Sequence, residues 1–359
     1  MTWKAEEILL KGTMVVWITS KLLTWRLWTT QRLFPTIPIW NFLDSTSAIV
    51  HSILFVISIL LMLAVFKFYL NKYIISTLII TEIFSCILDI NRLQPWEYQF
   101  IFVLIIYLTN KSNLLSVIIF SIACIYIYSG LQKLHPAFLQ NIWGKLFLNK
   151  FFNLESSMIY NKWVIHSGYI LALYESFGGL ALLFKKTRKF AIYALMIMHL
   201  FILLFFGPLI LNINFIIWPW NLLMLFYLFI FLNEQKNISF NYAILIYKWN
   251  KLITICLAIM PLLGIFGYWD QYLSANLYSG KNIGAVIFIK DTDKTSQLHR
   301  FFKKKNENDT SKNQYYINLN AWSLEELHVP LYPEKRVLKA IESKLKIRYG
   351  GESFNIRYY

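Results

Sequence analysis

The sequence predicts an all-α polytopic membrane helix bundle of about eight spans, with an N-terminal interfacial helix and a small C-terminal α+β soluble tail. Hydrophobic residues make up 57% of the 359 residues and charged residues 15%, whereas about 25% are charged in a typical soluble domain. Apolar runs recur between residues 48 and 268, and a run of about 18 residues is typical of a membrane span. After about residue 270 the composition becomes polar and basic.

Three segments follow from this pattern: 1–46, 47–269 and 270–359. The first mixes apolar residues and tryptophans such as Trp25 with basic residues such as Lys21. This mixture indicates an amphipathic helix in the membrane interface, or alternatively an arm packed on the membrane domain. No cleavable signal peptide is recognisable, because charges interrupt every apolar block near the N-terminus.

Hydropathy places the membrane spans in the second segment. The candidate spans are about 48–69, 73–90, 98–109, 113–131, 163–184, 190–207, 215–232 and 251–268. The run 98–109 is short for a crossing, and either re-enters the membrane or continues into the next run. Every span must satisfy its backbone hydrogen bonds internally, and no ten-residue alternation is present, so a helix bundle is expected instead of a barrel.

Basic residues indicate the orientation. Four cations, Lys185, Lys186, Arg188 and Lys189, lie in one short hairpin between two spans, which favours the cytoplasm for that hairpin. The chain is therefore expected to be a multi-pass protein of a cell inner membrane with a periplasmic tail. Lysines in 132–162, expected on the tail's side, weaken this argument.

The remaining composition limits the partners. The net charge of +16 is attributed to topology signals and anionic lipid, and no nucleic-acid partner is expected. The three cysteines lie in apolar runs without a Cys-x-x-Cys pair, and no metal-binding spacing is found. In the tail, Ala285 to Lys290 and Tyr315 to Leu319 are predicted strands, His299 to Lys312 a solvated loop, and Glu334 to Leu345 a helix.

Three ionisable residues are the catalytic candidates: Lys133, Glu175 and His199. Lys133 ends the fourth span, where it can act as a general base or simply reach the lipid headgroups. Glu175 and His199 lie near the centres of adjacent spans, where ionisable groups are rare. Both are ten residues from the basic hairpin, about 15 Å deep at 1.5 Å per residue. They could form a proton relay or a structural lock between helices.

A second group gathers on the side of the membrane away from the basic hairpin. It is predicted to bind substrate and comprises His166, Asn214, Trp218, Trp220 and Asn221. Tryptophans at this depth commonly form an aromatic belt, which is the alternative for each taken singly. Glu82 and Asp89 are weaker buried candidates, and Asp89 is expected to pair with Arg92. No phosphate-binding loop and no nucleophile elbow are found.

The segment Gly130-Leu131-Gln132-Lys133-Leu134 resembles the membrane domain of vitamin K-dependent gamma-carboxylase and the related horizontally transferred transmembrane (HTTM) domain. The similarity continues through Glu175 to Phe184 and Met198-His199, and the wider DoxX-like group has a comparable layout. The resemblance implies that Lys133 is the base that deprotonates reduced vitamin K. The tail of about ninety residues is too short for the carboxylase's substrate-binding region, so protein-glutamate carboxylation is not carried over.

Other segments resemble a family of Bacteroidetes membrane proteins. They include Arg92 to Gln99, Trp218 to Asn221, Leu277 to Gly280 and Pro330 to Arg336, and the likeness spans nearly the whole chain. This resemblance implies relatives without implying an activity.

Three functional hypotheses result. The first is a quinone-linked redox or carboxylase-like enzyme with an outward-facing site, for which a quinone is the possible cofactor. The second is a non-catalytic membrane subunit whose tail binds an envelope protein through residues 322–336. The third is a transporter, against which the absence of a recognisable inverted repeat counts.

Overall fold

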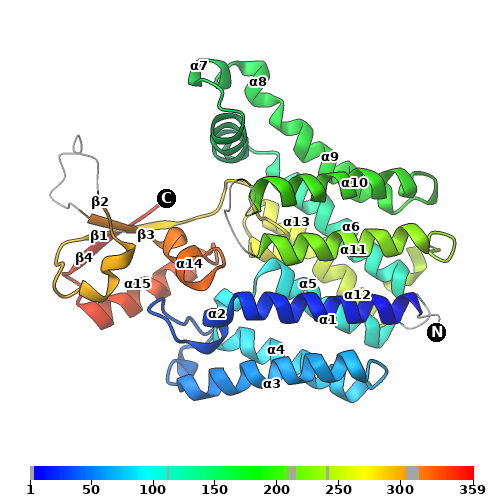
Figure 1. Cartoon of the computed structure of the whole chain (residues 1–359), viewed down its shortest axis with the longest axis horizontal. Helices are drawn as coiled ribbons and strands as arrows, with labels where there is room; N and C mark the ends of the chain where they lie inside the picture. The colour runs from blue at the N-terminus through cyan, green and yellow to red at the C-terminus, as the bar shows by residue number, and fades with distance from the viewer. Residues whose placement is uncertain (1–3, 111–112, 208–209, 211–215, 240–241, 305–314) are drawn as a thin grey trace. The chain divides into compact units, whose positions relative to one another are not determined.

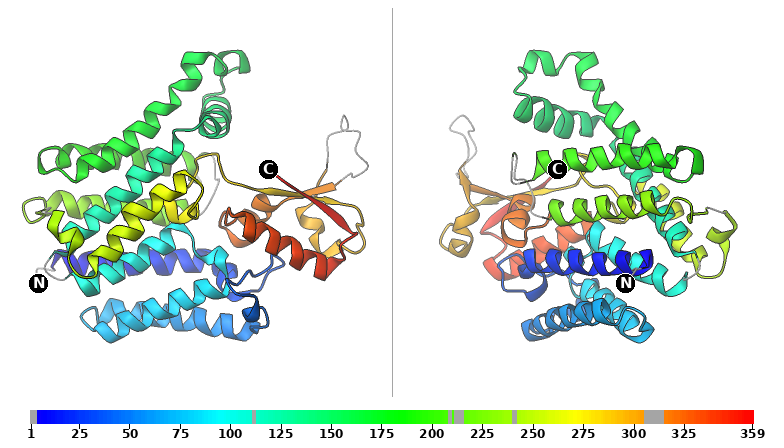
Figure 2. Two further views of the ribbon diagram at one scale, coloured as in Figure 1. Left: turned by 180° about the vertical axis from the view of Figure 1, so that it is seen from behind. Right: turned by 45° about the vertical axis from the view of Figure 1, so that its right-hand side comes forward.

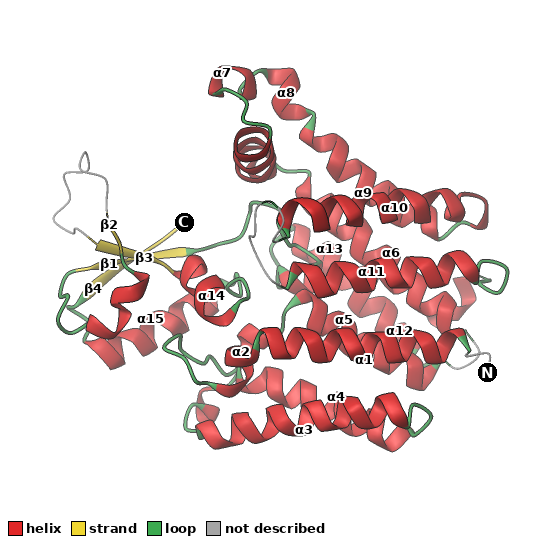
Figure 3. Cartoon of the chain, in the orientation of Figure 1, coloured by secondary structure: helices red, strands yellow, loops and turns green. Residues whose placement is uncertain are grey.

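The fold is described from a computed structural model of the chain (Figure 1). The residues described are 4–110, 113–207, 210, 216–239, 242–304 and 315–359. Helices account for most of them, and strands occur only in the C-terminal part of the described chain (Figure 3). The expectation of a mainly helical chain with a small C-terminal sheet is therefore confirmed.

The elements follow one another as listed here. The helices up to residue 182 are α1 (Ala5–Leu23), α2 (Trp25–Thr29), η1 (Asn41–Leu43), α3 (Ala48–Lys67), α4 (Lys72–Leu88), η2 (Ile90–Arg92), α5 (Pro95–Thr109), α6 (Leu114–Lys133), η3 (Phe138–Phe151), α7 (Ser156–Ile159), α8 (Lys162–His166) and α9 (Gly168–Leu182). The later elements are α10 (Lys185–Phe206), α11 (Ile217–Asn233), η4 (Tyr242–Ile246), α12 (Asn250–Thr254), η5 (Ile255–Ile259), α13 (Met260–Ile265), η6 (Tyr272–Ser274), β1 (Ala285–Ile289), η7 (Ser296–Phe301), β2 (Lys303–Lys304), β3 (Tyr315–Asn318), α14 (Leu319–Leu327), α15 (Lys335–Tyr349) and β4 (Phe354–Tyr358).

Three of the described helices are long and apolar enough to cross a membrane: α3, α6 and α10, with 20, 20 and 22 residues. Shorter apolar helices are α5, α11 and the run Asn250–Ile265. The short run predicted at 98–109 lies in α5, which ends at Thr109 before α6 begins at Leu114. By length and composition the chain is thus compatible with a membrane protein.

Helix α1 agrees with the expected N-terminal helix, but its side chains pack inside the chain. Leu9, Leu10, Met14 and Trp17 are fully buried, and so is the basic residue Lys21. The buried Lys21 is shielded from solvent, and its Nζ atom instead forms an ion pair with Glu82 of α4 at 2.7 Å. This burial fits the packed arm that the sequence left as the alternative to an interfacial helix.

The described chain divides into two compact units. Unit 1 comprises residues 1–13, 98–203 and 221–282, and unit 2 comprises 14–97, 204–220 and 283–359. In unit 2, α3 and α4 form an antiparallel pair that lies side by side in both views of Figure 2. The C-terminal tail shares this unit with the N-terminal helices.

The tail contains an antiparallel sheet with strand order β2-β3-β1-β4. Residues Ala285, Ile287 and Ile289 of β1 are buried and alternate with less buried neighbours, as expected when one face of a sheet is covered. Helices α14 and α15 cover that face (Figures 1 and 2). The apolar stripe predicted on α15 is buried, from Val337 to Leu345.

Two parts of the tail differ from the sequence-based expectation. Residues 299–301 and 303–304, expected in a solvated loop, belong to η7 and β2 respectively, and Phe301 is buried against Trp322. The rest of that loop, 305–312, lies outside the described residues. The sequence reading also missed α14 and β4, because α14 is short and β4 alternates only over five residues.

Candidate functional site

The candidate site in unit 1 begins with one face of α6. Tyr126, Ser129, Gly130 and Lys133 are spaced so that they lie on the same side of this helix. Lys133 is the last helical residue, at the boundary predicted from hydropathy. The face therefore presents a phenol, a hydroxyl and an amine in succession along about two helical turns.

Helix α9 packs against this face at very short range. A Cβ atom on Gly130 would lie 2.2 Å from Ser176 Oγ and 2.4 Å from the Ala172 carbonyl oxygen. A Cβ atom on Gly179 would lie 2.8 Å from the Ala123 carbonyl oxygen. Glycine is required at both positions because the two backbones approach so closely, as small residues allow in membrane helix pairs.

This close approach brings Glu175 of α9 to Lys133. The Lys133 Nζ atom lies 2.5 Å from Glu175 Oε2 and donates a second hydrogen bond to Ser129 Oγ at 2.7 Å. The two side chains are 15% and 13% exposed, so the pair is neither fully buried nor free in solvent. The arrangement holds an amine between a carboxylate and a hydroxyl at a partly exposed position.

His199 of α10 occupies a separate, fully enclosed position. Its Nε2 atom lies 2.6 Å from the Tyr126 hydroxyl, and its Nδ1 atom lies 2.6 Å from Asn221 Oδ1 of α11. Because a carboxamide oxygen only accepts, Nδ1 carries the proton and Nε2 accepts from Tyr126. The result is a neutral imidazole between a phenol donor and an amide acceptor.

Glu175 and His199 do not hydrogen-bond each other among the described residues, although their similar depth made a pair conceivable. Glu175 faces α6 and takes Lys133 as its partner, whereas His199 meets Tyr126 and Asn221. The sequence gives depth along each helix but not the direction in which a side chain points around it.

The described members of the predicted substrate-binding group are divided between the two units. His166 is exposed on α8, where Nδ1 lies 2.7 Å from the Lys162 carbonyl oxygen. Trp218 and Trp220 belong to unit 2, and Trp220 packs on Trp96 with ring centroids 6.0 Å apart. Asn214 lies outside the described residues. Of this group, Asn221 is hydrogen-bonded to the catalytic candidate His199.

Sequence reasoning missed Tyr126 and Ser129 as members of the site. Both stand on the α6 face that ends in Lys133, and their spacing of seven and four residues before it was an available signal. Next to the site, partial burial and then the charge of Lys281 lower the pKa of His135. His135 is therefore neutral at pH 7, since an unperturbed histidine has a pKa of about 6.5.

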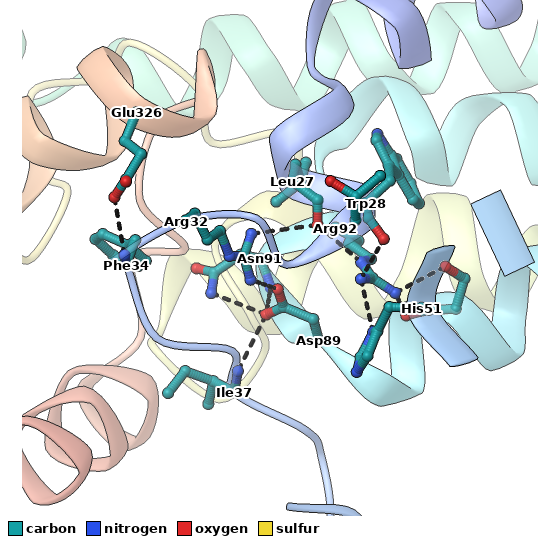
Figure 4. A network of polar contacts seen from close by, with 12 residues as sticks. Leu27, Trp28, Arg32, Phe34, Ile37, His51, Asp89, Asn91, Arg92 and Glu326 are labelled. Carbon is teal, nitrogen blue, oxygen red and sulfur yellow. Dashed lines mark hydrogen bonds and ion pairs between the residues drawn. The ribbon is translucent and has the colours of Figure 1, made fainter. Parts of the chain in front are cut away.

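Unit 2 contains a second polar cluster that the sequence indicated only in outline (Figure 4). Asp89 was expected to pair with Arg92, but it forms its ion pair with Arg32. Asp89 Oδ1 also accepts from the Ile37 amide at 3.2 Å and from Asn91 Nδ2 at 3.0 Å. A fully buried carboxylate thus fixes the chain between α2 and η1, because burying it unpaired would be costly.

Arg92 is fully buried and uses all of its N–H groups on other partners. It donates to the carbonyl oxygens of Leu27, Trp28 and Ser85, to Ser85 Oγ, and to His51 Nδ1 at 2.8 Å (Figure 4). Since arginine only donates, His51 Nδ1 accepts and the proton of this imidazole sits on Nε2. These hydrogen bonds connect α2, α3 and α4 to one another through the Arg92 side chain.

The tail is tied to the same region through Glu326 of α14. Its carboxylate accepts from the backbone amides of Leu33 and Phe34 at 2.8 Å each, and from Trp322 Nε1 at 2.8 Å. Arg300 donates to it at 2.6 Å. Residues 322–336 were proposed from the sequence as a recognition surface, but Trp322, Glu326 and Tyr332 in this range are buried.

The described residues offer few other candidate sites. A cavity of about 520 Å³ is lined by residues 29–31 of unit 2 and by α3, and none of the predicted site residues lines it. No group of three or more His, Cys, Asp or Glu side chains that could hold a metal ion occurs in the described part of the chain.

Comparisons with known protein families, with curated proteins and with solved structures gave no match. The carboxylase, HTTM and DoxX-like resemblance, and the resemblance to Bacteroidetes membrane proteins, thus remain predictions. The functional argument rests on the geometry of the two units.

Proposed function

We propose that this chain is a multi-pass membrane enzyme with a proton-transfer site at Lys133 and Glu175. Three full-length apolar helices support a membrane location. Five shorter apolar segments complete the eight crossings: α4, α5, α9, α11 and 250–265. With 15 to 17 residues each, they span about 23 to 26 Å, which a locally thinned bilayer accommodates.

The orientation proposed is that of a cell inner-membrane protein. The hairpin at Lys185 to Lys189 faces the cytoplasm, and one crossing by α9 separates it from Lys133. The end of α6 and the C-terminal tail then face outward, into the periplasm of a bacterium. Glu175 lies at the middle of α9, so Lys133 reaches it from the outer end of α6, and this outward-facing site is open to a lipid-soluble substrate.

The proposed substrate class is a quinone in its reduced, dihydroxy form. A neutral Lys133 amine takes the proton of one hydroxyl, so an O–H bond breaks and an N–H bond forms. The Glu175 carboxylate, 2.5 Å from Nζ, then stabilises the ammonium group that this transfer produces. The ion pair at the end of α6 is the observation that carries this proposal.

The resemblance to the gamma-carboxylase membrane domain supports the same role for Lys133. The enclosed Tyr126, His199 and Asn221 chain has a structural role in this proposal, because it fixes the imidazole between a phenol donor and an amide acceptor. Carboxylation of protein glutamate is not part of the proposal.

The experiment is a quinone assay on the purified full-length protein. Extracted quinone and turnover with a reduced quinone analogue are measured for wild type, Lys133→Met and Glu175→Gln. The matched control is Lys145→Met, an exposed lysine of η3. Quinone in the wild type, with turnover lost in both site variants and kept in the control, supports the proposal. A wild type without quinone or turnover, or unchanged turnover in both site variants, overturns it.

A second candidate function is a non-catalytic membrane subunit whose tail binds an envelope partner. The Glu326 contacts favour it, because they hold the tail firmly on the segment around Phe34. The partner would meet the exposed residues Glu325, Lys335 and Arg336.

Crosslinking tests this second function. A photoreactive residue at Lys335 should capture one stable partner, whereas the same residue at the exposed Lys145 should not. The chain is also tested without residues 283–359. If this shortened chain folds and keeps its turnover of the reduced quinone analogue, the tail is not the functional element and this candidate fails.

A further inference from the structure

Unit 2 contains two carboxyl groups that contact each other away from solvent. Glu82 of α4 is 0% exposed and Glu97 of α5 is 1% exposed. Trp17 and Lys21, one turn apart on α1, donate to Glu97 and Glu82 respectively and hold the two carboxyl groups next to each other. A carboxylate can only accept, so two neighbouring carboxyl groups can hydrogen-bond each other only if one of them carries a proton.

The surrounding donors occupy the other oxygens of the pair. Lys21 Nζ donates to Glu82 Oε2 at 2.7 Å, and Ser58 Oγ donates to Glu82 Oε1. Trp17 Nε1 donates to Glu97 Oε2 at 2.8 Å. The last oxygen, Glu97 Oε1, is buried and receives no N–H or O–H donor. It is the position at which an added proton completes the hydrogen bonding of the pair.

The charges near the pair also indicate that one of the two carboxyl groups carries a proton. Lys21 is the cation that hydrogen-bonds it, so two ionised carboxylates would leave one negative charge without a bonded cation. Arg92 directs its donors to carbonyl oxygens, Ser85 and His51, and Arg32 pairs with Asp89. In the described part of the chain, the buried thiol of Cys86 is a further titratable neighbour of the pair. Two like charges in contact cannot both ionise at low cost.

We propose that Glu82 and Glu97 form a buried site that binds one exchangeable proton. The proton lies between the two carboxyl groups, with Lys21, Ser58 and Trp17 as fixed donors around them. A metal ion does not fit this shell, because Mg²⁺ or Ca²⁺ needs several acceptor oxygens and three of the four here already face donors.

Proton release from this site changes the helix packing. The two carboxylates would repel each other in a region without water, which pushes α4 and α5 apart or draws Lys21 of α1 between them. Proton occupancy is therefore coupled to the contacts of α1, α3, α4 and α5 in unit 2. The inference does not depend on the Lys133 proposal, since it uses other residues and another readout.

Infrared spectroscopy of the full-length protein in an ester-free detergent tests the proposal. A protonated carboxylic acid has its own C=O stretch, which shifts in D₂O and disappears when the group ionises. The wild type should show this band at neutral pH and lose it at alkaline pH. The band should be absent from Glu97→Gln and Glu82→Gln, and kept in Glu325→Gln, which changes an exposed glutamate.

The wild-type spectrum decides the question even where a variant does not fold. No protonated-carboxyl band at neutral pH in the wild type overturns the proposal outright. A band that persists unchanged in both Glu97→Gln and Glu82→Gln places the proton elsewhere and also overturns it.

Discussion

Lys133 Nζ lies 2.5 Å from Glu175 Oε2 across the contact between α6 and α9, with side chains 15% and 13% exposed. The pair Lys21 and Glu82 has a similar length of 2.7 Å, but its side chains are 1% and 0% exposed. The two pairs thus have similar geometry in different surroundings. We therefore expect a ligand to reach only the first pair, and we expect the enclosed pair to be open to proton exchange alone.

The coupling between Lys133 and Glu175 should be measurable by a double-mutant cycle. With Lys133→Met, Glu175→Gln and the double variant, the unfolding free energies should give a coupling of about 1 kcal/mol, the upper range for partly exposed pairs. The control is the pair Glu7 and Lys11 of α1, with similar exposure and 2.7 Å separation. Its coupling should be smaller, about 0.3–0.5 kcal/mol, as for pairs within one helix. Equal couplings would show that the site pair is not tighter than a local pair.

Gly130→Ala should destabilise the contact between α6 and α9. The added Cβ meets backbone and hydroxyl atoms at 2.2 to 2.4 Å, so the helices must separate at a cost of about 1–3 kcal/mol. Thermal unfolding of the purified protein measures this loss. Gly351→Ala is the control, because the nearest atom to its added Cβ is 4.0 Å away. A Gly130→Ala protein as stable as the wild type would contradict the close approach.

Asn221→Leu should weaken the interior around His199. The substitution removes the acceptor at 2.6 Å from Nδ1, and a buried N–H without a partner costs about 1–3 kcal/mol. Chemical denaturation compares this variant with Asn237→Leu, which changes an exposed asparagine after α11. If both variants lose the same stability, the hydrogen bond to His199 contributes nothing specific.

Glu342 should make the tail sensitive to acid. Burial alone would raise the pKa of Glu342, but its hydrogen bonds with Lys346 and Tyr358 and the nearby lysine charges outweigh burial and lower it. A carboxyl with a lowered folded pKa adds stability above its unfolded value of about 4.3, and that stability is lost as pH falls through the folded pKa.

The measurement is the difference in Tm between wild type and Glu342→Gln over a range of pH. The difference should be present at neutral pH and shrink toward zero in acid. Glu325→Gln, at an exposed position of α14, should show no such trend. A difference between wild type and Glu342→Gln that is independent of pH would contradict the assigned interactions.

The sequence predicted the ends of elements better than their partners. It placed the end of α6 near Lys133 and the strands β1 and β3 to within one residue, because hydropathy and alternation are local signals. It could not predict which helix faces which. The pairing of Lys133 with Glu175 depends on how α6 and α9 turn toward each other, and Gly130 and Gly179 set that through close packing.

Polar contacts between residues far apart in the sequence also could not be predicted. Glu326 finds the amides of Leu33 and Phe34 almost three hundred residues earlier, and no local pattern marks such a contact. Arg92 is close to Asp89 in the sequence, but Asp89 pairs with Arg32, because the N–H groups of Arg92 donate to carbonyl oxygens. Sequence proximity was a poor guide where several charges share one interior.

The proposed function requires a membrane-spanning bundle with Lys133 on its outer side, and cysteine labelling tests this directly. Cys86, Cys124 and Cys256 are replaced by alanine, and single cysteines are introduced as His135→Cys, beside Lys133, or Thr187→Cys, in the basic hairpin. Both positions are exposed and flank the proposed crossing by α9. In spheroplasts, a membrane-impermeant thiol reagent should label His135→Cys and leave Thr187→Cys unlabelled until the membrane is permeabilised. Labelling of Thr187→Cys in intact spheroplasts, or equal labelling of both, would contradict the account.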